Sequence, residues 1–167
     1  PNGTLWLGLS KGLYKKAPDE AVSQIIPNKY INDIICVGDS LFTGTSNGVL
    51  YISCSNPRHT KVLTENKNVQ TLFYKQLWIG TFNNGLWTLD PTTGIVEHIE
   101  KQNSCFSSPI RAITAYDDHT LLIGIDGGGV HTVNLETKRS NLFINTEDNS
   151  DIYLQGNGVY AVTRDHQ

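Results

Sequence analysis

The sequence contains no methionine, only three cysteines and no long hydrophobic run, and each absence excludes something. Three cysteines in 167 residues are too few for a domain built on a disulfide framework. No apolar run comes near the length of about 18 residues that a transmembrane helix needs, so we expect no transmembrane helix within these residues. Because the chain opens at Pro1 without an initiator methionine, we expect it to be a piece of a longer protein.

An excess of charge of one sign is also missing. Lysine and arginine number 13 against 16 aspartate and glutamate, which leaves a formal net charge of −3. This balance argues against a nucleic-acid-binding protein, which normally carries a basic stripe, so we expect no nucleic acid to be bound by this region. Charged residues make up only 17% of the chain and hydrophobic residues 38%, a composition typical of one folded domain and not of a disordered segment.

A five-residue apolar motif with glycine at its fourth position occurs four times. The copies span residues 5–9, 41–45, 77–81 and 121–125, and their glycines are Gly8, Gly44, Gly80 and Gly124. A second glycine opens another apolar run four or five residues later, at Gly12, Gly48, Gly85 and Gly129. The residues immediately before the second glycine are Ser10-Lys11, Ser46-Asn47, Asn83-Asn84 and Asp126-Gly127-Gly128, which favours a hairpin turn that uses the second glycine's positive φ.

Two further short elements accompany each motif. A strand precedes the later motifs, at 31–35, 69–73 and 110–115, and a fourth copy closes the chain at 159–163. A weaker strand follows each second run, at 21–26, 59–64, 95–99 and 140–144. Only residues 17–23 have a composition that favours a helix, and that stretch is too short to outweigh the repeated pattern of strands. The pattern therefore predicts an all-β fold.

Four short strands in a period of about 40 residues are typical of one blade of a β-propeller. We therefore expect residues 1–167 to form a single β-propeller region of about four blades, each with four antiparallel strands. The expected blades are 1–28 completed by 157–167, 29–66, 67–104 and 105–156. The same pattern is compatible with a closed four-bladed ring and with part of a larger propeller.

The blade that contains Trp78 resembles a known repeat. Trp78-Ile79-Gly80-Thr81, followed by Asn84-Gly85-Leu86-Trp87 and the turn Asp90-Pro91-Thr92-Thr93-Gly94, is similar to the two-component regulator propeller repeat. Residues 159–167 resemble the front half of such a repeat, and residues 1–8 resemble what would follow it. The match is weaker in the two blades where Phe42 and Leu122 replace tryptophan.

In that family the repeats form the periplasmic sensor region of hybrid two-component system histidine kinases of Bacteroidetes. The resemblance implies a non-enzymatic, ligand-sensing fragment that responds to an oligosaccharide. It also implies partners: the rest of the sensor polypeptide, which would carry the membrane helix and the kinase, and a second copy in a homodimer. No cofactor is expected.

Candidate ligand-binding residues lie mainly at one variable repeat position. Trp87 aligns with Tyr14, Leu50 and His131, and this variation in size and polarity indicates a site that is not uniformly core. Trp87, His131 and Tyr14 are therefore candidates, together with Asp126 in the lengthened turn 126–129. Trp6 and Trp78 could stack on a sugar ring, but packing between blades is favoured for both, because Phe42 and Leu122 fill the same position.

Catalytic and metal-binding signals are weak. Cys36 and Cys54 have no metal-ligand spacing and are expected to be small buried side chains, with a bridge between them as the alternative. The five histidines do not share metal spacing, and the acidic stretch 147–151 lacks the glycine and terminal glutamate of a calcium loop, so a solvated loop is favoured. No nucleophile motif is present.

Two alternative functions remain open. Antibiotic-inactivating enzymes of the streptogramin-lyase type share similar repeats, so a propeller lyase or hydrolase is one alternative. That reaction would need a general base such as His131 or His119 beside a second polar group and a metal. The other alternative is a non-catalytic propeller whose faces bind another protein.

Overall fold

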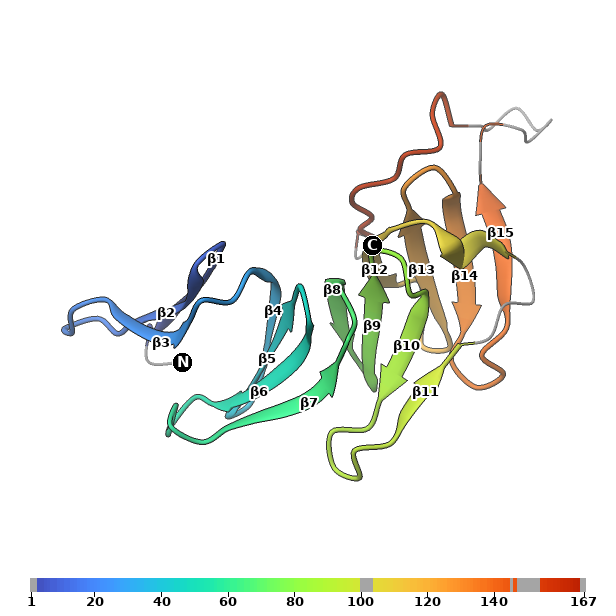
Figure 1. The fold of residues 1–167 in the computed structure, drawn as a ribbon. Coiled ribbons are helices and arrows are strands. Elements are labelled where there is room, and N and C mark those ends of the chain that lie inside the picture. The colour runs from blue at the N-terminus through green and yellow to red at the C-terminus, as the bar shows by residue number, and fades with distance from the viewer. Residues whose placement is uncertain (1–2, 100–103, 145, 147–153, 166–167) are drawn as a thin grey trace. The chain divides into compact units, whose positions relative to one another are not determined.

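The computed structural model describes residues 3–99, 104–144, 146 and 154–165. It contains four antiparallel sheets of three or four strands and is otherwise composed of turns and one short 3-10 helix (Figure 1). The chain divides into two compact units, Pro1–Val69 and Gln70–Gln167, called here the N-terminal and C-terminal units. The all-β propeller-type architecture predicted from the repeat is confirmed.

The N-terminal unit holds two sheets. The first has three strands in the order β1-β2-β3, and the second has four in the order β4-β5-β6-β7. Neighbouring strands are antiparallel throughout, and within each sheet every strand pairs with the next one along the chain. The strands are β1 Leu5–Leu9, β2 Gly12–Lys16, β3 Ser23–Pro27, β4 Ile31–Val37, β5 Ser40–Thr45, β6 Gly48–Ser53 and β7 Thr60–Glu65.

The C-terminal unit holds two four-stranded sheets with the same meandering order. One is β8-β9-β10-β11 and the other is β12-β13-β14-β15. A 3-10 helix, η1 Ser104–Ser107, lies between them in the chain and was not predicted from the sequence. The strands are β8 Val69–Tyr74, β9 Leu77–Thr81, β10 Leu86–Leu89, β11 Val96–His98, β12 Ile110–Ala115, β13 Thr120–Ile125, β14 Gly129–Asn134 and β15 Ser140–Ile144.

The second glycine of the motif closes the hairpin that its sequence predicts. Gly48 has a φ of 139°, and a Cβ added there would lie 1.9 Å from the Thr64 carbonyl oxygen, so no side chain fits. The preceding threonine of the motif holds the same turn, because Thr45 Oγ1 donates to the Gly48 carbonyl at 2.9 Å and accepts from the Asn47 N–H at 3.1 Å. The predicted positive φ is also found at Gly12, Gly85 and Gly129.

The first glycine of the motif is where one sheet meets the next. A Cβ at Gly8 would lie 2.6 Å from Ile31 Cγ2 at the start of β4, and a Cβ at Gly80 would lie 2.6 Å from Ile110 Cγ2 at the start of β12. The same glycine in two repeats thus receives the first apolar residue of the following blade. This contact explains why the motif and the following strand repeat together.

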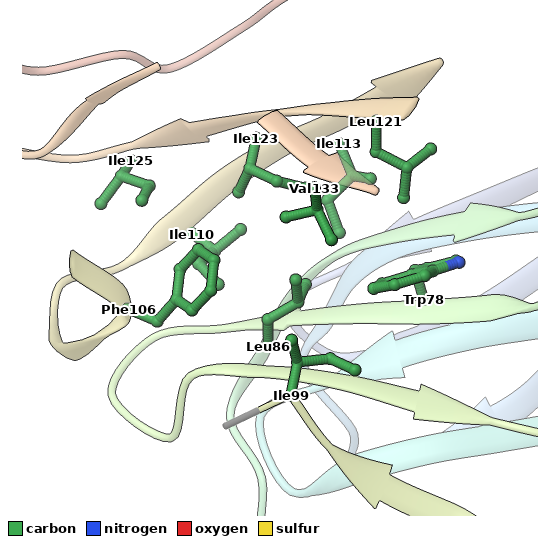
Figure 2. Packing of buried hydrophobic residues seen from close by; sticks show 10 residues of the cluster. All are labelled: Trp78, Leu86, Ile99, Phe106, Ile110, Ile113, Leu121, Ile123, Ile125 and Val133. Atoms are coloured by element: carbon green, nitrogen blue, oxygen red, sulfur yellow. The ribbon is translucent and has the colours of Figure 1, made fainter. Parts of the chain in front are cut away.

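Apolar side chains fill the space between the sheets of each unit. In the C-terminal unit, residues from both sheets and from η1 point toward one another and form one buried cluster (Figure 2). Trp78 is fully buried there, which is the packing role favoured from the sequence. The cluster consists of Trp78, Leu86, Ile99, Phe106, Ile110, Ile113, Leu121, Ile123, Ile125 and Val133.

The N-terminal unit has a smaller cluster of the same kind. Its buried members come from β2, β4, β5 and β6, and half-buried side chains including Trp6 and Cys54 pack around them. Leu122 in the C-terminal unit and Phe42 in the N-terminal unit are both buried at the position of the motif's tryptophan. The buried members are Leu13, Ile31, Leu41, Leu50 and Ile52.

The strand predicted at 159–163 is not formed. Gly158, directly before this segment, makes an isolated bridge with Asp126, and among the described residues no strand pairs with 159–163. Its apolar side chains lie against the first glycine of the preceding motif, since a Cβ at Gly124 would lie 2.9 Å from Val159 and 3.1 Å from Val162. The completion of the first blade by 157–167 stays a prediction, and the acidic stretch 147–151 lies outside the described residues.

In the described part of the chain, no helix has both the length and the apolar character needed to cross a membrane.

Candidate functional site

A polar or aromatic residue follows the first packed residue of β4, β8 and β12 and of the segment 159–163, which aligns with them in the repeat. The four residues at this repeat position are Asn32, Gln70, Arg111 and Tyr160. In β12 the pairing register shifts between Ile110 and Ala112, so Arg111 is the extra residue of a β-bulge. A bulge turns a side chain away from its usual direction in the sheet and is frequent beside functional sites. The same shift occurs in β4 between Ile31 and Asp33.

Arg111 is held by two side chains from neighbouring strand ends. Its Nη2 lies 3.0 Å and its Nε 3.3 Å from Asp126 Oδ2, and Asp126 directly follows β13. Its Nη1 donates to Gln70 Oε1 at 2.8 Å, and Gln70 is the second residue of β8. The planar guanidinium is thereby fixed by partners on two sides.

Two exposed aromatic rings flank the guanidinium. The Arg111 Cζ lies 5.6 Å from the centroid of the Phe82 ring and 5.8 Å from that of the Tyr160 ring. Phe82 is 42% exposed and Tyr160 67% exposed, whereas the Arg111 and Asp126 side chains are each 27% exposed. Gln70, Phe82, Arg111, Asp126 and Tyr160 are called the Arg111 cluster below.

The chemistry of the Arg111 cluster is that of a site for a polar ligand with an apolar face. The guanidinium supplies N–H donors and the carboxylate supplies acceptor oxygens, and hydrogen bonds to charged groups are the stronger ones. Because one positive and one negative charge are paired, the cluster has no excess charge to attract an anion. The exposed rings provide flat apolar surface beside these polar atoms.

Asp126 is the one sequence-predicted candidate that lies in the cluster. Trp87 lies on β10, where its indole Nε1 donates to the Asn84 carbonyl at 2.7 Å and its ring stacks on His98 with centroids 4.3 Å apart. Trp87 is half-buried and His98 exposed, so this pair offers an aromatic surface of its own. The contacts of Trp87 and Asp126 therefore involve different neighbours, and a ligand role for either stays a prediction.

His131 lies inside the C-terminal unit with only 5% of its surface exposed. Its Nε2 is 3.1 Å from the Gly128 carbonyl oxygen, and its ring faces Phe106 at 6.2 Å between centroids. Burial lowers the pKa of His131, because removal from water disfavours the charged imidazolium. This burial leaves little of His131 for a ligand to contact directly, and its predicted role is not tested by the structure.

Tyr14 belongs to the N-terminal unit. It is half-buried on β2, and its hydroxyl accepts a hydrogen bond from Gln24 Nε2 at 2.9 Å. Gln24 also donates to the Lys11 carbonyl at 3.1 Å, so the Tyr14 hydroxyl is part of a local network across β2 and β3. A ligand-binding role for Tyr14 stays a prediction.

A surface cavity of about 700 Å³ lies in the N-terminal unit. Lys15 Nζ lies 5.8 Å from the Trp6 ring, and both residues line the cavity. The Asp39 carboxylate on the same wall accepts from Ser53 Oγ at 2.6 Å and from the Ser55 N–H at 2.7 Å. These hydrogen bonds, that from the Ser53 side chain first, lower the pKa of Asp39.

The two cysteines at this cavity correct one expectation. Cys36 is exposed and Cys54 half-buried, whereas the sequence predicted both to be buried. Cys36 is exposed because it comes one residue before the end of β4, where the hairpin to β5 leaves the packed part of the sheet. Its position along the strand could not be judged without the register.

The lyase alternative would need His119 or His131 as a general base, beside a second polar group and a metal. His119 Nδ1 lies 3.6 Å from Glu136 Oε1, and both side chains are largely exposed. Among the described residues, no group of three or more histidine, cysteine, aspartate or glutamate side chains is close enough to hold a metal ion. His119 and His131 thus have different neighbours, one a carboxylate and the other a backbone carbonyl.

Four members of the Arg111 cluster were not singled out from the sequence. Gln70, Arg111 and Tyr160 share the position after the first packed residue, and Phe82 shares with Asp126 the position directly after the motif's five residues. A comparison of these positions across the repeats would have shown that neither is apolar in a consistent way. That variability is the signal that could have located the site.

No protein-family model and no curated protein matches the sequence. Solved structures do: two crystal structures of the extracellular domain of BT4673 from B. thetaiotaomicron superpose with TM-scores of 0.79 and 0.78 at 24% identity. They cover 99% and 98% of this chain, and BT4673 is described once as a putative one component system and once as a putative hybrid two component system. The chain spans about a quarter of the length of those domains, 24% in each case.

A second extracellular domain, that of the putative hybrid two component system BT3049 from B. thetaiotaomicron, matches 84% of the chain with a TM-score of 0.62 and 23% identity. The N-terminal domain of Nup159 matches 81% with a TM-score of 0.56 and only 12% identity. Proteins with such different names share this architecture, so the fold by itself does not define a function. The chain has the β-propeller blade fold found in the extracellular domains of BT4673 and BT3049.

Proposed function

We propose that this chain is part of the extracytoplasmic, ligand-sensing propeller of a hybrid two-component sensor histidine kinase and that it binds an oligosaccharide at the Arg111 cluster. The observation that carries the proposal is the Arg111–Asp126 ion pair, fixed by Gln70 and flanked by the exposed rings of Phe82 and Tyr160. The fold shared with the extracellular domains of BT4673 and BT3049 supports the location and the sensor role.

A neutral oligosaccharide suits this site better than an anion or an apolar ligand. Sugar hydroxyls both donate and accept, so they can bridge the Arg111 guanidinium and the Asp126 carboxylate at once. The C–H face of a pyranose ring can lie on the exposed ring of Tyr160 or Phe82, as apolar surface does on aromatic side chains. A ligand with a strong negative charge would be repelled by Asp126 as much as it is attracted by Arg111.

The proposed signal is a shift between conformations of the whole sensor. The kinase activity lies outside these residues, and the chain contributes only the difference in ligand affinity between two arrangements of the sensor homodimer. A ligand that binds both arrangements equally shifts nothing. A tenfold preference for one arrangement corresponds to about 1.4 kcal/mol of driving free energy at room temperature.

The proposal is tested by binding measurements on the chain and its variants. An array of neutral and uronic-acid oligosaccharides is applied first, and calorimetry then measures the affinity for the best neutral one. We expect Tyr160→Ala to weaken binding about tenfold, because one aromatic face contributes about 1 kcal/mol or more. Tyr30→Ala is the matched control, since Tyr30 is 54% exposed and lies in the N-terminal unit.

The outcomes separate the proposal from its alternatives. Equal affinities of the Tyr160→Ala and Tyr30→Ala variants would place the ligand elsewhere. Absence of binding to every oligosaccharide on the array, by a chain that melts cooperatively, would contradict the proposed ligand class. Preference for uronic-acid oligosaccharides over neutral ones would show that the Arg111–Asp126 pair does not act as a neutral unit.

A further inference from the structure

Cys36 and Cys54 lie against one another at the cavity of the N-terminal unit. Their Sγ atoms are 3.7 Å apart, although the residues belong to different strands and are separated by 18 positions in the chain. Cys36 is near the end of β4, and Cys54 directly follows β6. The contact therefore spans from the first strand of this sheet to the end of its third strand.

The backbone around the two thiols is held by hydrogen bonds. The Cys54 N–H donates to the Asp39 carbonyl at 2.8 Å, and Asp39 is in the turn between β4 and β5. The Asp39 carboxylate binds Ser53 Oγ at 2.6 Å and Ser55 Oγ at 3.0 Å, on both sides of Cys54. The turn after Cys36 and the segment around Cys54 are thus already fixed to each other, so a bond between the sulfurs needs little reorganisation of the chain.

The two sulfurs differ in accessibility. Cys36 is exposed, whereas Cys54 is half-buried and packs on the apolar cluster of the N-terminal unit. Burial is the main cause that raises the pKa of Cys54 to about 11, so this thiol stays protonated at neutral pH. Both residues line the cavity of about 700 Å³, which gives a small reagent room to reach Cys36. Cys36 is therefore the first thiol to react.

We propose that Cys36 and Cys54 form an intramolecular disulfide by exchange with a disulfide-bearing oxidant. The Cys36 thiolate attacks one sulfur of the oxidant, forms a mixed disulfide and releases the other sulfur as a thiolate. Cys54 then loses its proton and attacks Cys36 Sγ, and the oxidant's second sulfur leaves as a thiolate. Two protein thiols become one disulfide, and one oxidant disulfide becomes two thiols, so electrons and protons balance.

The geometry suits this bond. An S–S bond is about 2.0 Å long, so the two sulfurs have to approach by about 1.7 Å from their separation of 3.7 Å. The bond would join the β4–β5 turn to the end of β6 and make one wall of the cavity more rigid. This inference rests on the local geometry of the N-terminal unit and does not depend on the proposed ligand or sensor role.

The test is a count of free thiols in the full chain after treatment with oxidised glutathione. After oxidation under native conditions and labelling in denaturant, we expect thiol-reactive maleimide to label three cysteines in the reduced chain and one, Cys105, in the oxidised chain. The mass of the chain should fall by two hydrogen atoms, and peptide mapping should find the Cys36 and Cys54 peptides joined until a reductant is added. Cys105→Ser is the control and should keep the cross-link.

Every other result overturns the inference. Three free thiols after prolonged oxidation would show that the two sulfurs do not react. A stable mixed disulfide with glutathione on Cys36 would show that Cys54 cannot complete the exchange. Cross-links that involve Cys105, or that join two chains, would place the reactive pair elsewhere. Cys54→Ser should keep glutathione on Cys36, which separates the first step from the second in case other variants fold poorly.

Discussion

Replacing Gly80 with alanine tests the contact by which one sheet meets the next. The added Cβ would lie 2.6 Å from Ile110 Cγ2 and 2.7 Å from Thr71 Cγ2, distances that real Cβ atoms essentially never show. Both neighbours are buried, and Ile110 belongs to the central apolar cluster, so neither can rotate into open space. The two sheets would have to move apart or adopt unfavourable rotamers.

The expected cost follows from two opposing effects. Overpacking a buried contact by one methyl group typically costs about 1–3 kcal/mol. Alanine also restricts the unfolded chain, which stabilises the folded state by about 0.4–1 kcal/mol. The net loss should be about 1–2 kcal/mol, which in a domain of this size lowers the melting temperature by roughly 2–8 °C.

The assay is thermal unfolding followed by circular dichroism, with Gly156→Ala as the matched control. The substitution at Gly156 adds the same Cβ, but no atom lies within 4 Å of it and no positive φ is required there. Gly156→Ala should leave the melting temperature unchanged or raise it slightly. Thr71→Ser removes one of the two clashing methyl groups, so it should be less destabilising in the Gly80→Ala background than in the parent.

Equal melting temperatures for Gly80→Ala and Gly156→Ala would refute this reasoning. The glycine would then owe its place in the motif to something other than the approach of the next blade. Additive effects of Gly80→Ala and Thr71→Ser would refute the geometric part alone, because residues in contact are expected to couple by about 0.5 kcal/mol or more.

Three further predictions concern other parts of the chain. The pKa of His131 in the folded state is lowered from 6.5, so below that pH the unfolded state binds more protons than the folded state. The melting temperature of the parent should therefore decrease between about pH 7 and 5, and that of His131→Gln should decrease less. Oxidation of Cys36 and Cys54 closes a loop of 18 positions and should stabilise the chain by about 3 kcal/mol, measured as a melting temperature that falls on reduction in the parent but not in Cys54→Ser. The hydrogen bond from the Thr92 N–H lowers the pKa of Asp90, so Asp90→Ala should melt earlier at pH 7, and the difference from the parent should shrink as the pH falls below 3.8.

The strands could be predicted because their signals are local and repeat. The motif glycines, the turn residues and the alternation of apolar positions together specify hairpins, and tertiary packing had only to agree with them. Strand ends were less certain: the strand predicted at 21–26 is found at Ser23–Pro27, because pairing with β2 and not propensity decides where it stops. The strand predicted at 159–163 does not form for the same reason: an apolar pattern makes a strand only where a partner strand pairs with it.

The candidate site could be predicted only in part. Asp126 was a candidate because of its turn, but Arg111 was not, because its place in a bulge depends on the pairing between β12 and β13. His131, a polar residue at a variable repeat position, is buried beside Phe106, and its predicted ligand role stays a prediction. Polarity at a repeat position does not tell which side of a sheet the residue faces.

At the bulge in β12, two consecutive residues make different kinds of contact. Ile110 Cγ2 lies against Gly80, whereas the next residue, Arg111, binds Gln70 and Asp126 through its guanidinium. In the four repeats this position holds the amides of Asn32 and Gln70, the guanidinium of Arg111 and the phenol of Tyr160. Each repeat therefore keeps an apolar residue for packing and carries a different polar or aromatic group directly after it, so the repeats can diversify at this position without a change of the packed contact.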